Sequence, residues 1–191
     1  MNYKKTQSFK SFINSKYYCS KHTNYFNVYD DLFSSYKNKK ITFVDIGVFS
    51  GGSLFMWKKF FGKRAKIIGV ELNPIAKQFE KYGFNIFIGD QSCEDFWSKF
   101  FKKVGKVDIV LDDGGHTNLD QIITVVSTVN KINDGGILVI EDTSTSYVNE
   151  YNSSKEFSFI EFTKKRINNN NSLLGSRWPR NTNTNILRCL L

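Results

Sequence analysis

The sequence predicts an α/β domain with a doubly wound, mainly parallel sheet and helices on both faces. Five short runs rich in Val and Ile recur along the chain, at residues 41–47, 66–72, 85–90, 107–113 and 136–142. Their nearly continuous apolarity is typical of parallel strands that are buried on both faces. A helical pattern follows each of the first four runs, and this alternation indicates a fold that binds ligands at the carboxyl ends of its strands.

The segments between the strands predict four helices, at residues 53–61, 74–83, 93–105 and 118–133. Pro74 suits the first turn of the second helix, and Thr117 or Asn118 can cap the fourth. We expect residues 1–40 to form an aromatic-rich helical cap segment and residues 41–191 to form the ligand-binding domain, within a single domain overall. Another amphipathic helix is expected after residue 150.

Length and composition fit one folded globular domain. The chain has 191 residues, of which 40% are hydrophobic and 24% charged, as in ordinary folded proteins. The apolar runs are much shorter than the roughly 20 residues that span a bilayer, and the polar start lacks the apolar centre of a signal peptide. We therefore expect a cytoplasmic protein without a membrane span. Three dispersed cysteines predict neither a disulfide framework nor a cysteine zinc site.

The formal charge of +9 raises the question of a nucleic-acid partner, because clustered Lys and Arg gain affinity by releasing counterions from phosphates. The basic clusters are short and dispersed, however. The chain is also rich in Asn, Lys, Ile, Phe and Tyr, whose codons are AT-rich, so mutational bias is another source of the charge. Nucleic acid is therefore the weaker alternative as a partner.

A glycine-rich loop, in VDIGVFSGGS, follows the first predicted strand and opens a helix. In this setting backbone N–H groups can meet a polar or anionic ligand. The spacing of Gly47, Gly51 and Gly52 matches neither the dinucleotide fingerprint nor the phosphate-binding loop, and Asp45 would repel a pyrophosphate. The alternative is that these glycines serve only tight packing of the strand against the helix.

Acidic residues end the other predicted strands. Glu71 ends the second strand, where an acid can accept hydrogen bonds from a ribose diol, and Asp90 ends the third, where it can meet an adenine edge. VLDDGGH and VIED end the fourth and fifth strands. Taken singly, each of these acids is more often a solvated strand end or a helix cap.

These motifs resemble a known family. DIGVFSGGS, VELNP, GDQS and VLDDGGH, in this order, resemble the class I S-adenosylmethionine (SAM) dependent methyltransferases. SKHTNYFNVYDDLF, GGSLFMWKKFF, LDDGGH and IEDTSTSY are similar to the metal-dependent sugar O-methyltransferases related to macrocin O-methyltransferase, and to the cephalosporin hydroxylase-like proteins. The resemblance covers roughly residues 20 to 165 and implies a Rossmann-like SAM-binding domain.

The resemblance also implies a role for each motif. Residues of the glycine loop and of three strand ends would bind SAM, namely Asp45, Gly47, Gly51, Gly52, Ser53, Glu71, Asp90, Gln91 and Asp112. Asp112 would either face SAM or brace its loop. Asp113, Glu141 and Asp142 would hold Mg²⁺, and His116 would be the general base. Thr145 and Tyr147 are candidates for the acceptor pocket.

Physical chemistry supports the metal and base roles independently. Three carboxylates that converge from two strand ends repel one another unless a cation lies among them. Oxygen ligands with open positions suit Mg²⁺. Coordination to the metal would lower the pKa of a sugar hydroxyl, and a histidine, whose unperturbed pKa is about 6.5, can then take its proton at neutral pH.

The chain departs from the family pattern at two places. Gly115 stands where the family usually has serine or a similar polar residue, and we expect it to loosen the loop and to remove a hydrogen bond. SAM methyltransferases of this fold normally end with a hairpin of two further strands, whereas residues 182–191 provide for one. We expect an incomplete C-terminal strand pair, whose exposed edge would favour a homo-oligomer.

The sequence thus predicts a Mg²⁺-dependent and SAM-dependent O-methyltransferase. Its acceptor would be a sugar hydroxyl of a saccharide or a glycosylated small molecule. One alternative is a nucleic-acid methyltransferase, which only the positive charge favours. The other is a truncated SAM-binding remnant without turnover.

Overall fold

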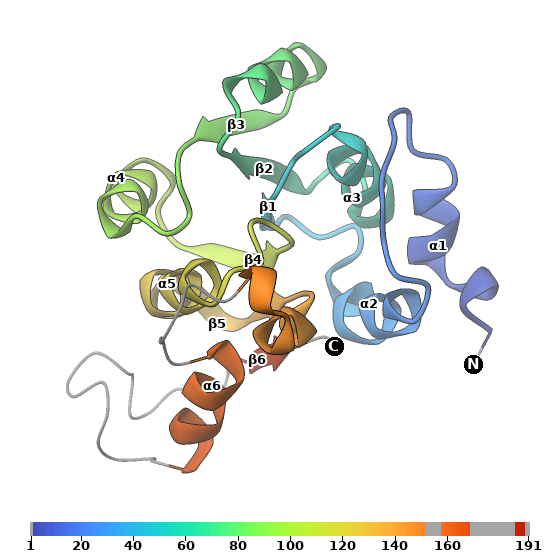
Figure 1. The fold of residues 1–191 in the computed structure, drawn as a ribbon. Helices are drawn as coiled ribbons and strands as arrows, with labels where there is room; N and C mark the ends of the chain where they lie inside the picture. Colours follow the sequence, from blue (N-terminus) through green and yellow to red (C-terminus); the bar gives the residue numbers. More distant parts are fainter. Residues whose placement is uncertain (1, 152–157, 169–185, 190–191) are drawn as a thin grey trace. The chain divides into compact units, whose positions relative to one another are not determined.

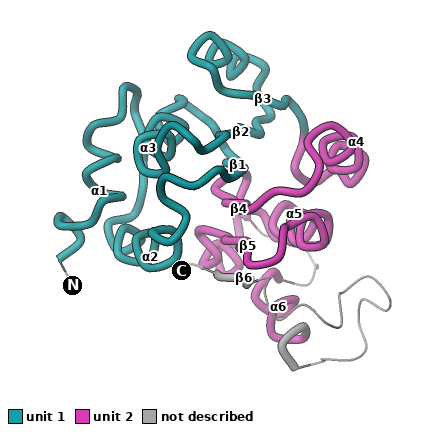
Figure 2. The backbone as a smooth tube through the Cα atoms, turned by 180° about the vertical axis from the view of Figure 1, so that it is seen from behind, with its two compact units in different colours: residues 1–89 teal, residues 90–191 magenta. Residues whose placement is uncertain are grey.

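The computed structural model describes residues 2–151, 158–168 and 186–189 (Figure 1). The chain forms two compact units, residues 1–89 and residues 90–191 (Figure 2). Whether residues 1–40 act as a cap on a domain that begins at residue 41 stays a prediction.

The first unit contains three parallel strands in the order β3-β2-β1, with bounds Thr42–Ile46 for β1, Lys66–Glu71 for β2 and Asn85–Ile88 for β3. α3 (Gly52–Phe61) connects β1 to β2, and the 3₁₀ helix η3 (Pro74–Tyr82) connects β2 to β3. Before the strands lie η1 (Tyr3–Lys5), α1 (Gln7–Phe12), α2 (Tyr25–Phe33) and η2 (Ser34–Tyr36). Pro74 opens η3 as expected, because its fixed φ suits a first helical turn.

Aromatic rings fill the core of the first unit. The Trp57 ring of α3 lies edge-on against Tyr29 and Phe33 of α2, with ring centroids 5.1 and 5.5 Å apart. All three side chains are fully buried. Edge-to-face pairs of this kind add to the free energy of burial. The aromatic-rich segment near the amino terminus thus contributes a helix whose rings pack in this core.

The second unit contains the parallel strands β4 (Val107–Asp112), β5 (Ile132–Ile140) and β6 (Ile186–Cys189), which pair in that order. α4 (Glu94–Val104) precedes β4. α5 (Asn118–Thr128) and η4 (Val129–Lys131) connect β4 to β5. η5 (Thr143–Tyr147), η6 (Asn149–Tyr151) and α6 (Phe159–Asn168) follow β5.

The predicted α/β class is confirmed, since parallel strands alternate with helices in both units. The fifth strand begins at Ile132 rather than at residue 136. Its pairing with β4 changes register between Val107 and Ile109, and Gly135 has a φ of 76°, so an irregular first section precedes the regular strand. β6 provides the expected last strand. Within the described residues, no helix is long and apolar enough to cross a membrane.

Candidate active site

In the first unit, Glu71 ties the loop after β1 to the end of β2. Its Oε2 accepts a hydrogen bond from the Phe49 backbone N–H at 2.8 Å. Its Oε1 accepts from the N–H groups of Leu72 and Asn73 at 2.9 and 3.0 Å. A carboxylate has about four acceptor positions, of which these bonds use three. A ribose hydroxyl can therefore add one good hydrogen bond at Oε2.

Large apolar side chains stand exposed beside this carboxylate. Phe49 is 75% exposed and Leu72 is 68% exposed, although both donate backbone hydrogen bonds to Glu71. The backbone of Phe49 is left-handed, with a φ of 44°, which is costly for a residue with a Cβ. An apolar surface with one fixed polar acceptor has the chemical character of a nucleoside site.

Other residues of the glycine loop form hydrogen bonds or pack closely within the first unit. Ser53 Oγ donates a buried hydrogen bond to Asp45 Oδ2 at 2.6 Å, which joins β1 to the start of α3. A Cβ on Gly51 would overlap the Phe79 ring, and one on Gly52 would overlap the Tyr18 carbonyl oxygen. Packing therefore requires glycine at positions 51 and 52, and contact of this loop with SAM stays a prediction. Gly47 is left-handed, with a φ of 89°.

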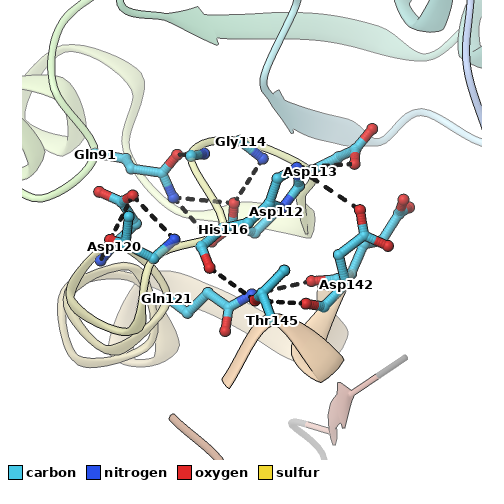
Figure 3. A network of polar contacts seen from close by, with 12 residues as sticks. Gln91, Asp112, Asp113, Gly114, His116, Asp120, Gln121, Asp142 and Thr145 are labelled. Carbon is cyan, nitrogen blue, oxygen red and sulfur yellow. Dashed lines mark hydrogen bonds and ion pairs between the residues drawn. The ribbon is translucent and has the colours of Figure 1, made fainter. Parts of the chain in front are cut away.

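In the second unit, two strand ends bring a histidine and two aspartates together (Figure 3). His116 Nε2 lies 3.9 Å from Asp113 Oδ1 and 3.7 Å from Asp142 Oδ2. Each of these side chains is about a fifth to a quarter exposed. One ligand atom from each residue lies within 4.8 Å of the other two. The expected meeting of the DDGGH and ED motifs thus occurs within this unit.

Glu141 differs from its neighbour Asp142. It is almost completely buried, with 1% exposure, and it does not belong to the cluster that the structure forms among the described residues. Its backbone N–H donates to the Asp112 carbonyl oxygen at 2.9 Å. Gln121 Nε2 donates to the Glu141 carbonyl oxygen at 3.1 Å. The role of Glu141 as a metal ligand therefore stays a prediction from the sequence.

Asp112 and Gln91 form a buried pair beneath the DDGGH loop. Gln91 Nε2 lies 3.0 Å from both carboxylate oxygens of Asp112. The backbone N–H of Gly114 donates to Asp112 Oδ1 at 3.1 Å, and that of Gly115 donates to Gln91 Oε1 at 2.9 Å. Burial raises the pKa of the Asp112 carboxyl to about 6, although these hydrogen bonds oppose the rise. Both side chains thus brace the loop, and contact of either side chain with SAM stays a prediction.

Asp90 has a local role in the second unit. Its Oδ1 accepts hydrogen bonds from the backbone N–H and the hydroxyl of Ser92 at 2.8 and 2.7 Å. This arrangement is an Asx turn, in which an aspartate side chain caps its own loop. Contact of Asp90 with adenine stays a prediction.

Gly115, which we expect to loosen the loop, is closely packed in the structure. A Cβ at this position would overlap Asp120 Oδ2, which accepts hydrogen bonds from the N–H and the hydroxyl of Thr117 in a capping box at the start of α5. The glycine makes room for a helix cap. Its own N–H is bonded to Gln91, so the loop is held at this residue.

Supporting residues on α5 were missed from the sequence. Asn118 Oδ1 accepts hydrogen bonds from Ser146 Oγ at 3.0 Å and from the Phe159 N–H at 2.7 Å. Thr124 Oγ1 accepts from Gln91 Nε2 at 3.2 Å. The buried face of α5 carries polar residues at helical spacing, namely Asn118, Gln121, Thr124 and Thr128. That polar stripe within a largely apolar helix was the available signal.

Comparisons with known proteins support a Rossmann-like methyltransferase fold. Mycinamicin VI 2''-O-methyltransferase of Micromonospora griseorubida is 32% identical over 126 residues, which are 62% of this chain and 31% of the relative. Demethylmacrocin O-methyltransferase of Streptomyces fradiae is also 32% identical over 126 residues, with the same shares. No family model matches the chain.

A solved structure supports the same resemblance. The MycE methyltransferase in complex with Mg, SAH and mycinamycin VI has a TM-score of 0.73 and 25% identity, and the match covers 89% of this chain and 48% of that one. The predicted Rossmann-like methyltransferase fold and the resemblance to the macrocin O-methyltransferase group are thereby confirmed. The chain spans about a third of the length of the curated relatives and about half that of the solved one.

Proposed function

We propose that this chain binds SAM and Mg²⁺ and transfers a methyl group to a sugar hydroxyl of a glycosylated small molecule. The observation that carries the proposal is the cluster of Asp113, His116 and Asp142 at the ends of two parallel strands. The names of the relatives support the proposal, because these proteins are O-methyltransferases that act on mycinamicin VI or demethylmacrocin. The related MycE complex contains Mg, SAH and mycinamycin VI.

The donor atoms of the cluster fit a divalent cation. One atom from each residue lies within 4.8 Å of the others, and opposite ligands of Mg²⁺ are roughly 4 Å apart, because each bond is about 2.0–2.1 Å long, so a bound ion would draw the two carboxylates slightly closer. Asp113 and Asp142 would hold the ion, with Glu141 added from the resemblance. A bound Mg²⁺ would supply Lewis acidity that lowers the pKa of a substrate hydroxyl.

His116 is the base in this proposal. Its Nε2 lies 3.7 and 3.9 Å from the two aspartate oxygens, distances that are too long for a hydrogen bond. Nε2 is thus held near both carboxylates and can accept the proton of the acceptor hydroxyl. That proton transfer makes the oxygen a nucleophile, and correct placement of the reacting groups supplies much of the remaining rate enhancement.

The residues of the first unit supply the nucleoside contacts in the proposal. Glu71 would accept a ribose hydroxyl at Oε2, and Leu72 and Phe49 would offer apolar surface to the nucleoside. When bound, SAM supplies the electrophilic methyl group. A cytoplasmic location and a homo-oligomer stay predictions from the sequence.

Metal binding by variants tests the proposal. We expect Asp113→Asn and Asp142→Asn each to weaken binding of Mn²⁺, which uses the same oxygen ligands as Mg²⁺, by at least tenfold in calorimetric titration. His116→Ala should keep metal binding and lose methyl transfer, by roughly 10²–10⁴-fold for a general base. Asp134→Asn is the matched control, because Asp134 is an exposed aspartate near the other end of β5.

Other outcomes would redirect the assignment. Loss of metal binding in His116→Ala would make the histidine a ligand instead of the base. Methyl transfer that is indifferent to EDTA would overturn the metal site. Transfer to RNA or DNA in place of a glycosylated acceptor would favour the nucleic-acid alternative.

A further inference from the structure

Two residues of the site have a backbone conformation that rarely suits a side chain. His116 has a φ of 60° and Asp142 a φ of 54°, which is the left-handed region. A non-glycine residue there is strained and persists only where its surroundings hold it. The structure must therefore contain contacts that fix these two residues.

One side chain contacts the backbone of both (Figure 3). Thr145 Oγ1 lies 2.8 Å from the His116 carbonyl oxygen and 2.8 Å from the Asp142 carbonyl oxygen. His116 lies in the loop after β4, whereas Asp142 and Thr145 lie after β5. This threonine therefore joins the two loops that carry the base and the metal ligand.

The hydroxyl has a single proton to share between these two carbonyls. The Asp142 carbonyl already accepts the backbone N–H of Thr145 at 3.0 Å. Within the described part of the chain, Thr145 is the residue that donates to the His116 carbonyl. The hydroxyl proton of Thr145 is therefore best donated to the His116 carbonyl oxygen. This hydrogen bond joins residues that lie 29 positions apart in the sequence.

We propose that Thr145 is a positioning residue that sets the distance between His116 and Asp142. It holds the left-handed backbone of His116 against the turn that presents Asp142, and so keeps Nε2 within 3.7 Å of that carboxylate. The roles of the two residues as base and ligand rest on the proposed function. The restraint by Thr145 is a property of the chain without any ligand.

Substitutions at Thr145 test this role. Thr145→Val removes the hydroxyl and keeps the branched shape, whereas Thr145→Ser keeps the hydroxyl. Thr163→Val is the matched control, because the Thr163 hydroxyl also donates to a carbonyl at 2.8 Å, but within α6. Thr145→Ala gives a second test should the valine variant not fold. The readouts are the Mn²⁺ dissociation constant and hydrogen exchange of the amides of residues 114–117 in metal-free protein.

We expect Thr145→Val and Thr145→Ala to raise the Mn²⁺ dissociation constant about 10-fold or more, as loss of an outer support of a metal site does. Exchange at residues 114–117 should be faster in both. Thr145→Ser should restore both readouts to within about threefold of wild type, and Thr163→Val should change neither.

Wild-type exchange and wild-type Mn²⁺ affinity in a folded Thr145→Val or Thr145→Ala variant would overturn the inference. If Asp113→Asn and Asp142→Asn left Mn²⁺ affinity unchanged, the proposed metal site would fail instead. The exchange measurement in metal-free protein would then still decide whether Thr145 restrains the loop.

Discussion

The buried carboxylate of Asp112 makes the free energy of unfolding depend on pH. It is 2% exposed and is held by Gln91 and by the N–H of Gly114. Burial raises its pKa to about 6, against about 3.9 in an unfolded chain. The folded state therefore binds this proton more tightly than the unfolded state does. The resulting stability is present below about pH 4 and is lost as the pH rises through about 6.

The pH dependence of Asp112→Asn tests this coupling. In metal-free protein with EDTA, the free energy of unfolding of wild type relative to the variant should fall by about 2 kcal/mol between pH 4 and pH 7, since a pKa difference of one unit corresponds to about 1.4 kcal/mol. Urea unfolding at each pH provides the measurement. Parallel curves for the two proteins would show that Asp112 titrates near its ordinary value.

Backbone conformation could not be predicted for single residues. Phe49, His116 and Asp142 are left-handed, yet nothing in DIGVFSGGS, DDGGH or IEDTSTSY distinguishes them from residues with ordinary backbone. Phe49 and His116 are bonded to residues distant in sequence, Glu71 and Thr145, whereas Asp142 is bonded to Thr145 three residues later. The residue types of the site were predictable, whereas the side chains that hold them in place were not.

At the scale of elements, the start of α3 shows that a glycine can be required by protein packing. A Cβ on Gly52 would overlap the Tyr18 backbone, and Ser15 Oγ donates to the Gly52 carbonyl at 2.8 Å. The segment that follows α1 therefore lies directly on the first turn of α3. A backbone neighbour cannot turn aside as a flexible side chain can.

Gly52→Ala should thus destabilise the protein, although alanine normally favours a helix by up to about 1 kcal/mol. We expect a net loss of roughly 1–3 kcal/mol, typical of overpacking, and faster tryptic cleavage at Lys16 and Lys21. Gly83→Ala separates overpacking from backbone strain: its φ of 85° strains an alanine although a Cβ there meets nothing within 4 Å, so this variant should lose some stability without faster cleavage at Lys16 and Lys21. Stability equal to or above wild type in Gly52→Ala would show that the segment shifts without cost.

Strands were predictable because buried parallel strands need continuous apolar runs, and four of them begin and end close to the expected residues. The first section of β5 was missed because it contains Asn133, Asp134 and Gly135, which are typical turn residues. Pairing with β4 overrides that local preference. Propensity alone could not reveal a pairing with a distant strand.

At the scale of the whole molecule, ligand binding should raise the stability of the fold. A ligand at about 100 times its dissociation constant adds about 2.7 kcal/mol to the free energy of unfolding. In a chain of 191 residues, this corresponds to a rise in melting temperature of roughly 5–10 °C. SAM should produce such a rise in wild type.

Glu71→Gln should remove most of that rise, because it weakens the acceptor for ribose and the bond that holds the loop at Phe49. Glu94→Gln, at an exposed acid in the first turn of α4, should leave the rise unchanged. Differential scanning fluorimetry with and without SAM makes the comparison. An equal rise in all three proteins would remove Glu71 from the cofactor site.

The close approach of Gly115 to Asp120 also has an evolutionary consequence. A side chain at position 115 would occupy the space that the Asp120 carboxylate, which caps α5, now fills. The two positions should therefore covary among related proteins. A relative with serine at the position of Gly115 should carry a smaller residue at that of Asp120, or a helix that starts with a different cap.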